Sequence, residues 1–156
     1  LGRYFMQLDA DDWLNEDCLA KLVETLDDAP PEVGFCYGDT QYHGKLNQRY
    51  QPPPFRVNDF WRGFASLYPV LYRREAFEAG CRYRGILEID GKKVGCLDYD
   101  FALQLIHFMR WDGIALPGHL VLNYSYADGM NSLVENPDLL TAFRALWGSS
   151  LKVQKL

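Results

Sequence analysis

The stretch Tyr4-Phe5-Met6-Gln7-Leu8-Asp9-Ala10-Asp11-Asp12, near the start of the chain, decides how the rest of the sequence is interpreted. Residues 4–8 are mostly apolar and rich in side chains that favour β-structure, so they predict a buried strand. Three carboxylates follow at once, on Asp9, Asp11 and Asp12. In open α/β sheets, ligands bind at the carboxyl ends of strands, where these acids fall. Asp9 and Asp11 are therefore candidate ligands of Mg²⁺ or Mn²⁺, because hard divalent cations prefer carboxylate oxygens.

The acidic stretch has three other interpretations. The simplest is that these acids only cap the helix that follows. A calcium-binding EF-hand loop is excluded, because its fifth and sixth positions, counted from Asp9, hold Trp13 and Leu14 instead of a ligand and a glycine. A phosphohydrolase with Asp9 as nucleophile also begins with a strand and Asp-X-Asp. It stays open as a weak alternative, because Asp12, Trp13 and Leu14 stand where a small residue and Thr or Val are expected.

The composition predicts one globular domain of acidic character. The 156 residues are 48% hydrophobic and 15% aromatic, which suits a sizeable core. The formal net charge of −5 argues against a nucleic-acid partner, whose binding needs clustered Lys and Arg. No run approaches the roughly 18 apolar residues of a transmembrane helix, and no signal peptide is recognisable. The four cysteines lack metal-binding spacing, so we expect reduced, mostly buried thiols in a cytoplasmic protein.

Hydrophobic periodicity and turn residues predict alternating helices and strands along the rest of the chain. The expected helices cover residues 15–27 (with Asn15 as the cap), 59–63, 73–80, 97–108 and 137–147. The expected strands are 33–37, 67–72 with Pro69 at an edge or bulge, and two strands within 114–126 on either side of a turn at Pro117-Gly118. Residues 41–54 predict an extended loop or irregular hairpin, and residues 89–92 predict a tight hairpin.

Three further positions place charged groups beside strand ends or a helix start. Asp39 follows strand 33–37 and repeats the junction of the first strand, although a simple turn role is equally open. Asp98 and Asp100 begin an apolar helix, where the helix dipole would hold a carboxylate ionised. A carboxylate in that position suits a general base that accepts a proton from a hydroxyl, whereas ordinary capping explains only one of the two acids. Arg73 could face an anionic ligand, or be solvated.

Taken as a set, three blocks of this sequence resemble the family 2 inverting glycosyltransferases. Leu8-Asp9-Ala10-Asp11-Asp12-Trp13-Leu14, within residues 2–23, looks like the metal-binding segment of that family and runs on into Val33-Gly34-Phe35-Cys36-Tyr37-Gly38-Asp39. Val70-Leu71-Tyr72-Arg73-Arg74-Glu75-Ala76-Phe77 resembles the strand and helix that lead towards the acceptor site. Leu97-Asp98-Tyr99-Asp100-Phe101 is similar to the acidic motif at the head of a buried helix. The resemblance covers about residues 2–132.

This resemblance implies a fold, a reaction and a set of site residues. The fold is an α/β nucleotide-diphospho-sugar transferase fold, a mixed sheet flanked by helices. Asp9 and Asp11 would hold a divalent cation, Mn²⁺ or Mg²⁺, against the diphosphate of a nucleotide-sugar. Asp98 would deprotonate the hydroxyl of a glycan, lipid-linked or other acceptor, which attacks the anomeric carbon with inversion. Further implied contacts are Asp12 and Asp39 to the donor, and Arg73 and Asp100 to the acceptor.

The chain departs from the family in three places. Leu97 replaces the first acid of the usual Glu-Asp pair, so Asp98 is the only matching base. Ala127 stands where the late loop often offers a histidine. The N-terminal strands that bind the nucleoside base in the family have no counterpart here, so residues 1–156 are expected to be the C-terminal portion of the catalytic domain, inactive alone. The sheet edge left exposed would favour self-association.

A second hypothesis is a non-catalytic remnant of such an enzyme that binds a saccharide or a protein partner. Aromatic residues such as Tyr42, Tyr50 and Phe55 would provide its contacts. Metal-dependent nucleotide binding distinguishes the two hypotheses. An enzyme of this family would be cytoplasmic, with peripheral attachment to the inner face of the membrane as a second option.

Overall fold

The computed structural model describes residues 2–57, 68–84, 87–89, 92–94, 97–126 and 141. Within them the chain forms a mixed α/β structure, as expected. Its elements in chain order are β1 (Tyr4–Met6), β2 (Trp13–Leu14), α1 (Cys18–Asp28), β3 (Val33–Gly44), β4 (Arg49–Tyr50), β5 (Leu71–Arg73), α3 (Glu75–Glu78), β6 (Leu87–Ile89), β7 (Lys92–Val94), α4 (Leu97–His107) and β8 (Asp112–Tyr126). The helices expected over 59–63 and 137–147 fall, apart from Thr141, outside the described residues.

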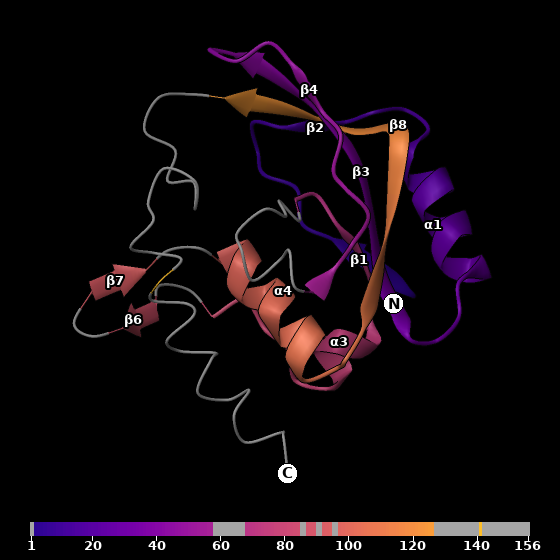
Figure 1. The fold of residues 1–156 in the computed structure, drawn as a ribbon, viewed down its shortest axis with the longest axis vertical. Helices are drawn as coiled ribbons and strands as arrows, with labels where there is room; N and C mark the ends of the chain where they lie inside the picture. The colour runs from indigo at the N-terminus through magenta and orange to yellow at the C-terminus, as the bar shows by residue number, and fades with distance from the viewer. Residues whose placement is uncertain are drawn as a thin grey trace.

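A curled sheet carries the main structure. Its strand order is β1-β5-β3-β8-β2, with β4 paired to the far part of β3. β3 and β8 are parallel, whereas the other described pairs of this sheet are antiparallel. These two strands are the longest, and they run side by side through the molecule with α1 on one side and α4 on the other (Figure 1). The sheet is therefore mixed and flanked by helices, as the sequence predicts.

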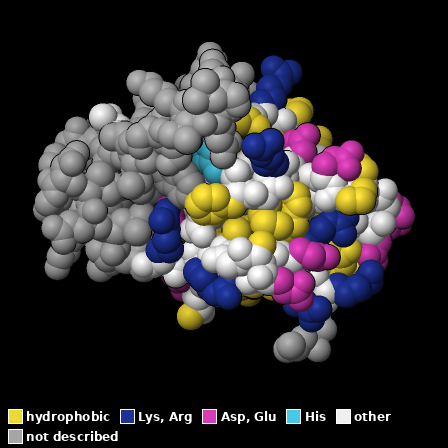
Figure 2. Space-filling view, turned by 90° about the horizontal axis from the view of Figure 1, so that it is seen from below, with side chains coloured by type: hydrophobic (Ala, Val, Ile, Leu, Met, Phe, Trp, Pro, Cys, Tyr) yellow, Lys and Arg dark blue, Asp and Glu magenta, His cyan; other side chains and the backbone are white. Residues whose placement is uncertain are grey.

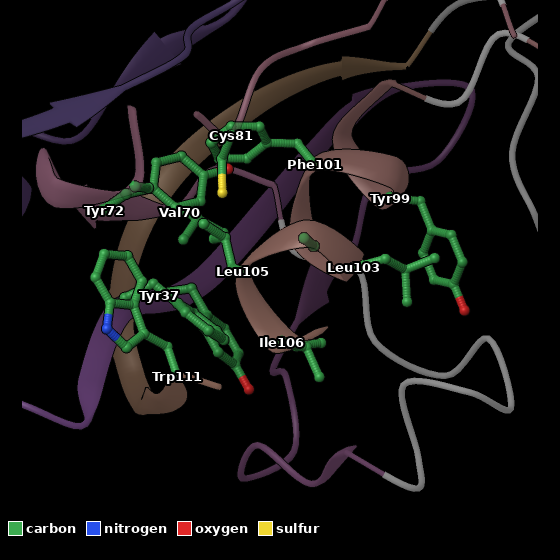
Figure 3. Close-up of a cluster of buried hydrophobic side chains, with 13 residues drawn as sticks. Tyr37, Val70, Tyr72, Cys81, Tyr99, Phe101, Leu103, Leu105, Ile106 and Trp111 are labelled. Carbon is green, nitrogen blue, oxygen red and sulfur yellow. The ribbon is translucent and has the colours of Figure 1, made fainter. Parts of the chain in front are cut away.

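Apolar clusters cover both faces of this sheet. Alternate side chains of a strand point to opposite faces. Phe35 and Tyr37 of β3 therefore pack with α4, whereas Cys36 between them packs with α1. Figure 3 shows the larger cluster, in which Phe101 and Leu105 of α4 belong with Tyr72 of β5 and Trp111. Helix α4 is more apolar than α1, because α4 is buried on nearly all sides whereas α1 exposes one face.

Several sequence-based boundaries are corrected by strand pairing. Helix α1 begins at Cys18 rather than at Asn15, because Trp13 and Leu14 join the sheet as β2 and the Asn15 N–H donates to the Val121 carbonyl over 2.9 Å. The strand expected over residues 33–37 continues to Gly44, where its far part pairs with β4 to form the hairpin expected over residues 41–54.

β8 is a single strand, so the expected turn at Pro117-Gly118 is wrong. Gly38 pairs with Leu116 and Asp39 with Leu120, so residues 117–119 form an excursion that has no partner on β3. After it the strand resumes in the same direction. Proline and glycine, which predict a reversal locally, here mark an interruption of the ladder. Pro69 precedes β5, which is an inner strand, so the expectation of an edge strand is wrong too.

Two smaller expectations are confirmed. The strands β6 and β7, on either side of Asp90-Gly91, pair antiparallel with Ile89 opposite Lys92. Three of the four cysteines, Cys18, Cys36 and Cys81, are free, buried thiols, and Cys96 lies outside the described residues. Among the described helices, none is long and apolar enough to cross a membrane.

Glycines in the β3–β8 pair make room for aromatic rings. Phe35 is the register partner of Gly113, and a Cβ on Gly113 would lie 2.2 Å from the Phe35 ring. A Cβ on Gly34 would lie 1.8 Å from the ring of Trp111. Real atoms cannot approach so closely, so each ring occupies the space of the missing side chain. These glycines therefore serve the packing between the strands and the core.

We predict that Gly113→Ala destabilises the fold by about 1–3 kcal/mol, because the added methyl overpacks against Phe35. Urea unfolding followed by circular dichroism measures the change. The matched experiment repeats Gly113→Ala in a Phe35→Leu background, where the smaller side chain leaves space and the added cost should fall. An equal cost in both backgrounds would show that the ring does not cause it.

Candidate functional site

The acids at the end of β1 lie in a tight turn at the surface. The Asp12 N–H donates to the Asp9 carbonyl over 3.2 Å and closes this turn. Asp9 and Asp11 are exposed, and Gln7 Nε2 donates to Asp9 Oδ1 over 3.3 Å. Both carboxylates are therefore open to a ligand from solvent.

Asp12 anchors this turn to the rest of the sheet. Its Oδ1 accepts a hydrogen bond from the Ser125 N–H over 2.8 Å, and its Oδ2 accepts one from the Tyr68 hydroxyl over 2.9 Å. The same hydroxyl oxygen accepts the Asp9 N–H over 2.7 Å. Burial raises the pKa of Asp12, with a further rise from the charges of Asp11 and Asp9, against the lowering by the two hydrogen bonds. Asp12 thus positions Asp9 and Asp11. The resemblance had assigned Asp12 itself to donor binding.

Asp98 lies in the first turn of α4 and is close enough to Asp9 for their charges to interact. Burial, and then the negative charge of Asp9, raise the pKa of Asp98 to about 6. The sequence predicted that the helix start would favour the ionised form of this acid, whereas its burial favours the protonated form and raises its pKa. Tyr72 and Tyr83 stand nearby: their hydroxyls are 3.3 Å apart, and the charge of Asp98 contributes to the raised pKa of each.

Asp100 takes part in a buried network. It has no exposed surface, and its carboxylate accepts Arg84 Nε over 2.7 Å, a second Arg84 nitrogen, and Gln104 Nε2 over 2.9 Å. Gln104 Nε2 also donates to the Arg82 carbonyl, over 2.8 Å. These bonds fasten residues 82–84 to α4. The acceptor contact that the sequence assigned to Asp100 would need surface that this carboxylate lacks.

Asp39 reaches the same end of the sheet as Asp9 but turns into the protein. Leu71 of β5 pairs with Met6 on one side and with Cys36 on the other. Asp9 comes three residues after Met6, and Asp39 comes three residues after Cys36. The Asp39 side chain is fully buried and accepts Arg49 Nε over 2.9 Å, Gln51 Nε2 over 3.1 Å and the Gly118 N–H over 3.1 Å. It holds the excursion of β8 in place instead of facing a donor.

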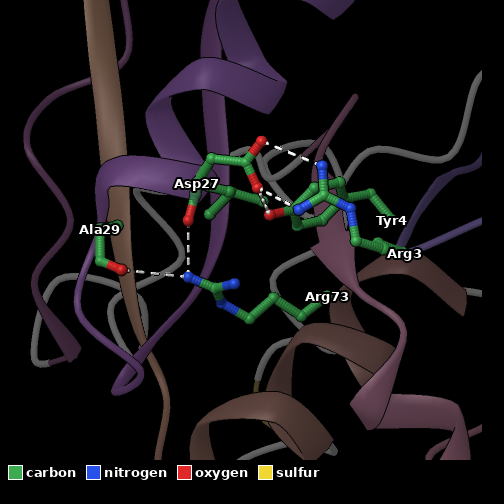
Figure 4. Close-up of polar contacts among 6 residues, drawn as sticks. Arg3, Tyr4, Asp27, Ala29 and Arg73 are labelled. Carbon is green, nitrogen blue, oxygen red and sulfur yellow. Dashed lines mark hydrogen bonds and ion pairs between the residues drawn. The ribbon is translucent and has the colours of Figure 1, made fainter.

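Arg73 lies at the opposite end of β1 from the acids, because β5 runs antiparallel to β1 and pairs Arg73 with Tyr4. Its Nε donates to the Val33 carbonyl over 2.8 Å, and its Nη2 donates to Leu26 over 2.7 Å and to Ala29 over 3.3 Å. These carbonyls end α1 and begin β3, so the guanidinium caps the helix (Figure 4). Neither the acceptor contact nor the solvated pair expected from the sequence describes this position.

Charged side chains surround Arg73 at the surface. A hollow of about 350 Å³ is lined by Arg3, Tyr4, Asp27, Arg73, Arg74, Glu75 and Glu78. Arg3 pairs with Asp27 over 2.7 Å and Arg74 with Glu78 over 3.0 Å. On the face seen in Figure 2, described basic and acidic side chains are likewise intermixed around exposed apolar atoms. Because these charges pair with each other, the hollow does not concentrate one sign of charge on a ligand.

The motifs in the sequence did not single out the tyrosines at this site. Tyr68 binds both Asp9 and Asp12, yet it lies far from them in the sequence. Tyr72 and Tyr83 are brought to Asp98 by the packing of β5 and residues 81–84 against α4. Tyrosine is common in cores, so only the tertiary structure distinguishes these three.

The carboxylates of Asp9 and Asp11 suit Mg²⁺ or Mn²⁺, which are commonly bound by one or two carboxylates together with substrate phosphates. Among the described residues, no three His, Cys, Asp or Glu side chains are grouped as a complete metal site. The remaining ligands would then be phosphate and water oxygens.

No protein-family model matches this chain, and no curated protein matches it significantly.

We predict that Arg73→Lys destabilises the fold by about 1–3 kcal/mol, because an ammonium cannot satisfy three carbonyls with the geometry of the guanidinium. Arg74→Lys, one residue on, is the matched control and should change stability by less than about 0.5 kcal/mol. Urea unfolding midpoints compare the two. Equal effects would contradict the capping role.

We predict that Asp98→Asn stabilises the fold at neutral pH. The folded pKa of about 6 lies above the ordinary aspartate value of 3.8, so stability is lost as pH rises between these values and stays low above them. The gain from Asp98→Asn should be about 3 kcal/mol at pH 7 and fall to about 1 kcal/mol at pH 4.5. Urea unfolding across this range measures it.

Asp28→Asn, on the exposed end of α1, is the charge-matched control, and its effect should not follow the same curve. Titration of the Asp98 carboxyl carbon by NMR gives an independent readout. Asp9→Asn should lower the pKa of Asp98, because it removes a nearby negative charge. A pKa that stays near 6 in that variant would place the two carboxylates too far apart to interact.

Proposed function

We propose that this chain is part of the catalytic domain of a nucleotide-sugar-dependent glycosyltransferase of the family 2, inverting type, with the corresponding transferase fold. One observation carries the proposal. Asp98 lies at the head of a buried helix, and its pKa is raised by burial and then by the charge of Asp9, which supports a site that includes the candidate base and a candidate metal ligand. In the sequence these acids belong to separate motifs, and the mechanism needs them together.

Asp98 is suited to act as the general base. A pKa near 6 leaves the carboxylate mostly ionised at neutral pH, while its affinity for a proton stays higher than that of an exposed aspartate. In the proposed reaction the acceptor hydroxyl gives its proton to an Asp98 oxygen. The acceptor oxygen forms a bond to the anomeric carbon as the bond from that carbon to the diphosphate oxygen breaks. The nucleoside diphosphate leaves with the electron pair, and the configuration is inverted.

The donor side is assigned to Asp9 and Asp11. Their exposed carboxylates would hold Mn²⁺ or Mg²⁺, which when bound offsets the negative charge of the leaving diphosphate. Asp12 keeps the turn in place through Tyr68 and Ser125, so that the two ligands stay on one side of it. The three free buried thiols agree with a cytoplasmic location, where nucleotide-sugars would be encountered.

A second candidate is the non-catalytic binding remnant. Three residues assigned to substrate have partners within the fold instead: Asp39 with Arg49, Asp100 with Arg84, and Arg73 with the end of α1. This observation favours a chain that kept the scaffold of a transferase without all of its contacts.

Isothermal titration of UDP, GDP and dTDP, each with and without Mn²⁺, tests the proposal. We predict metal-dependent binding of at least one nucleotide, weakened at least roughly tenfold by Asp11→Asn because one of two carboxylate ligands loses its charge. Asp28→Asn is the control for net charge and should bind normally. Asp98→Asn should also bind normally, since its role lies on the acceptor side. Absence of binding, or binding that Asp11→Asn leaves unchanged, would favour the second candidate.

A further inference from the structure

A patch of aromatic and amide side chains lies on one face of the sheet, over β2, β8 and β3. Gln41 and His43 are two apart on β3 and share one face, and Asn123 of β8 is the register partner of Gln41. Trp13 of β2 pairs with Asn123 from the other side. Tyr124 alternates with Asn123 and contacts Tyr68 on the opposite face. We call Trp13, Gln41, His43 and Asn123 the Trp13 platform.

The indole of Trp13 is both exposed and held in place. Its ring stacks on the His43 imidazole, with centroids 4.9 Å apart and planes at 28°. His43 Nε2 is hydrogen-bonded to Asn123 Oδ1 over 3.0 Å, which fixes the imidazole in turn. Even so, 49% of the Trp13 surface stays accessible. A large apolar ring that is ordered but uncovered is a feature of a binding surface rather than of a core.

Polar groups flank this ring with hydrogen-bonding capacity to spare. Gln41 Nε2 donates to the Tyr42 carbonyl over 3.0 Å, and Asn123 uses its oxygen with His43. Among the described residues, the Gln41 amide oxygen and the Asn123 amide nitrogen have no partner. One acceptor and one donor therefore stand beside an open aromatic face.

We propose that the Trp13 platform binds a neutral saccharide. The C–H faces of a pyranose ring carry partial positive charge and pack against the negative face of an indole, while its hydroxyl groups pair with amides. The platform itself contains no Lys, Arg, Asp or Glu. The neighbouring Arg49, which is the register partner of Gln41, already donates to the Asp39 carboxylate and to the Gly118 carbonyl, so its charge is paired within the fold. An apolar partner would bury the two amide groups without hydrogen bonds, which is costly.

This inference deepens the proposed function, because it names a sugar chain as the acceptor. Only the acceptor role rests on the proposed function. The turn with the metal ligands leads directly into Trp13, and the Asp12 carboxylate is bonded to Ser125 on the strand that carries Asn123. The platform is therefore joined to the turn that carries Asp9 and Asp11, both along the chain and through the bond between Asp12 and β8.

The test uses the whole chain and three soluble tetrasaccharides: cellotetraose, chitotetraose and maltotetraose. Titration followed by ¹⁵N NMR should shift the Trp13 indole N–H signal with at least one of them. Trp13→Ala should weaken that binding at least roughly tenfold, whereas Trp13→Tyr should keep a substantial part of it, since a smaller aromatic face remains. Phe108→Ala removes another exposed aromatic, 67% accessible, and should leave binding unchanged.

Absence of a shift with all three sugars would overturn the proposal. Concentration-dependent association in sedimentation velocity that Trp13→Ala abolishes, without sugar binding, would also overturn it and assign the platform to contact between copies of the chain. The result is separable from the nucleotide titration. Sugar binding with no nucleotide binding would support the platform and contradict the transferase. Nucleotide binding with no sugar binding would support the transferase and contradict the platform.

Discussion

The parallel pairing of β3 with β8 is the interaction on which the rest of this structure depends. It is the longest pairing described, and both apolar clusters include side chains from it. Parallel neighbours cannot be joined by a tight turn, so the chain between them must cross over the sheet. β5, α3 and α4 belong to that connection, and Asp98, whose pKa responds to the charge of Asp9, stands at the start of α4. The candidate site is thus a consequence of the crossover.

Buried charge distinguishes the acids of this protein. Asp39 and Asp100 are buried against Arg49 and Arg84, with further hydrogen bonds that satisfy their remaining oxygens. These contacts fasten loops to strands or helices. Asp98 differs in that its pKa is raised, first by burial and then by the charge of Asp9. A raised pKa suits a carboxylate that exchanges a proton.

Local pattern was sufficient for much of the architecture and for part of the site. The strand at β1, the helices α1 and α4, and the hairpin of β6 and β7 follow from periodicity and turn residues over short spans. The exposed pair Asp9 and Asp11 was identified in the same way. The turn predicted at Pro117-Gly118 was wrong, because a local signal cannot show that the partner strand β3 continues straight past the interruption. The start of α1 was misplaced for a similar reason, since β2 exists only through its pairing with β8.

The sequence by itself determined the main helices and strands, the alternation that gives β3 two apolar faces, and the acids after β1 and at the start of α4. Only the tertiary structure decided what those acids do. It turned Asp39 inwards, paired Asp100 with Arg84, sent Arg73 to the far end of β1 and brought Asp98 near Asp9. The reason is physical: the role of a carboxylate depends on burial and on nearby charges, which come from residues distant in the sequence.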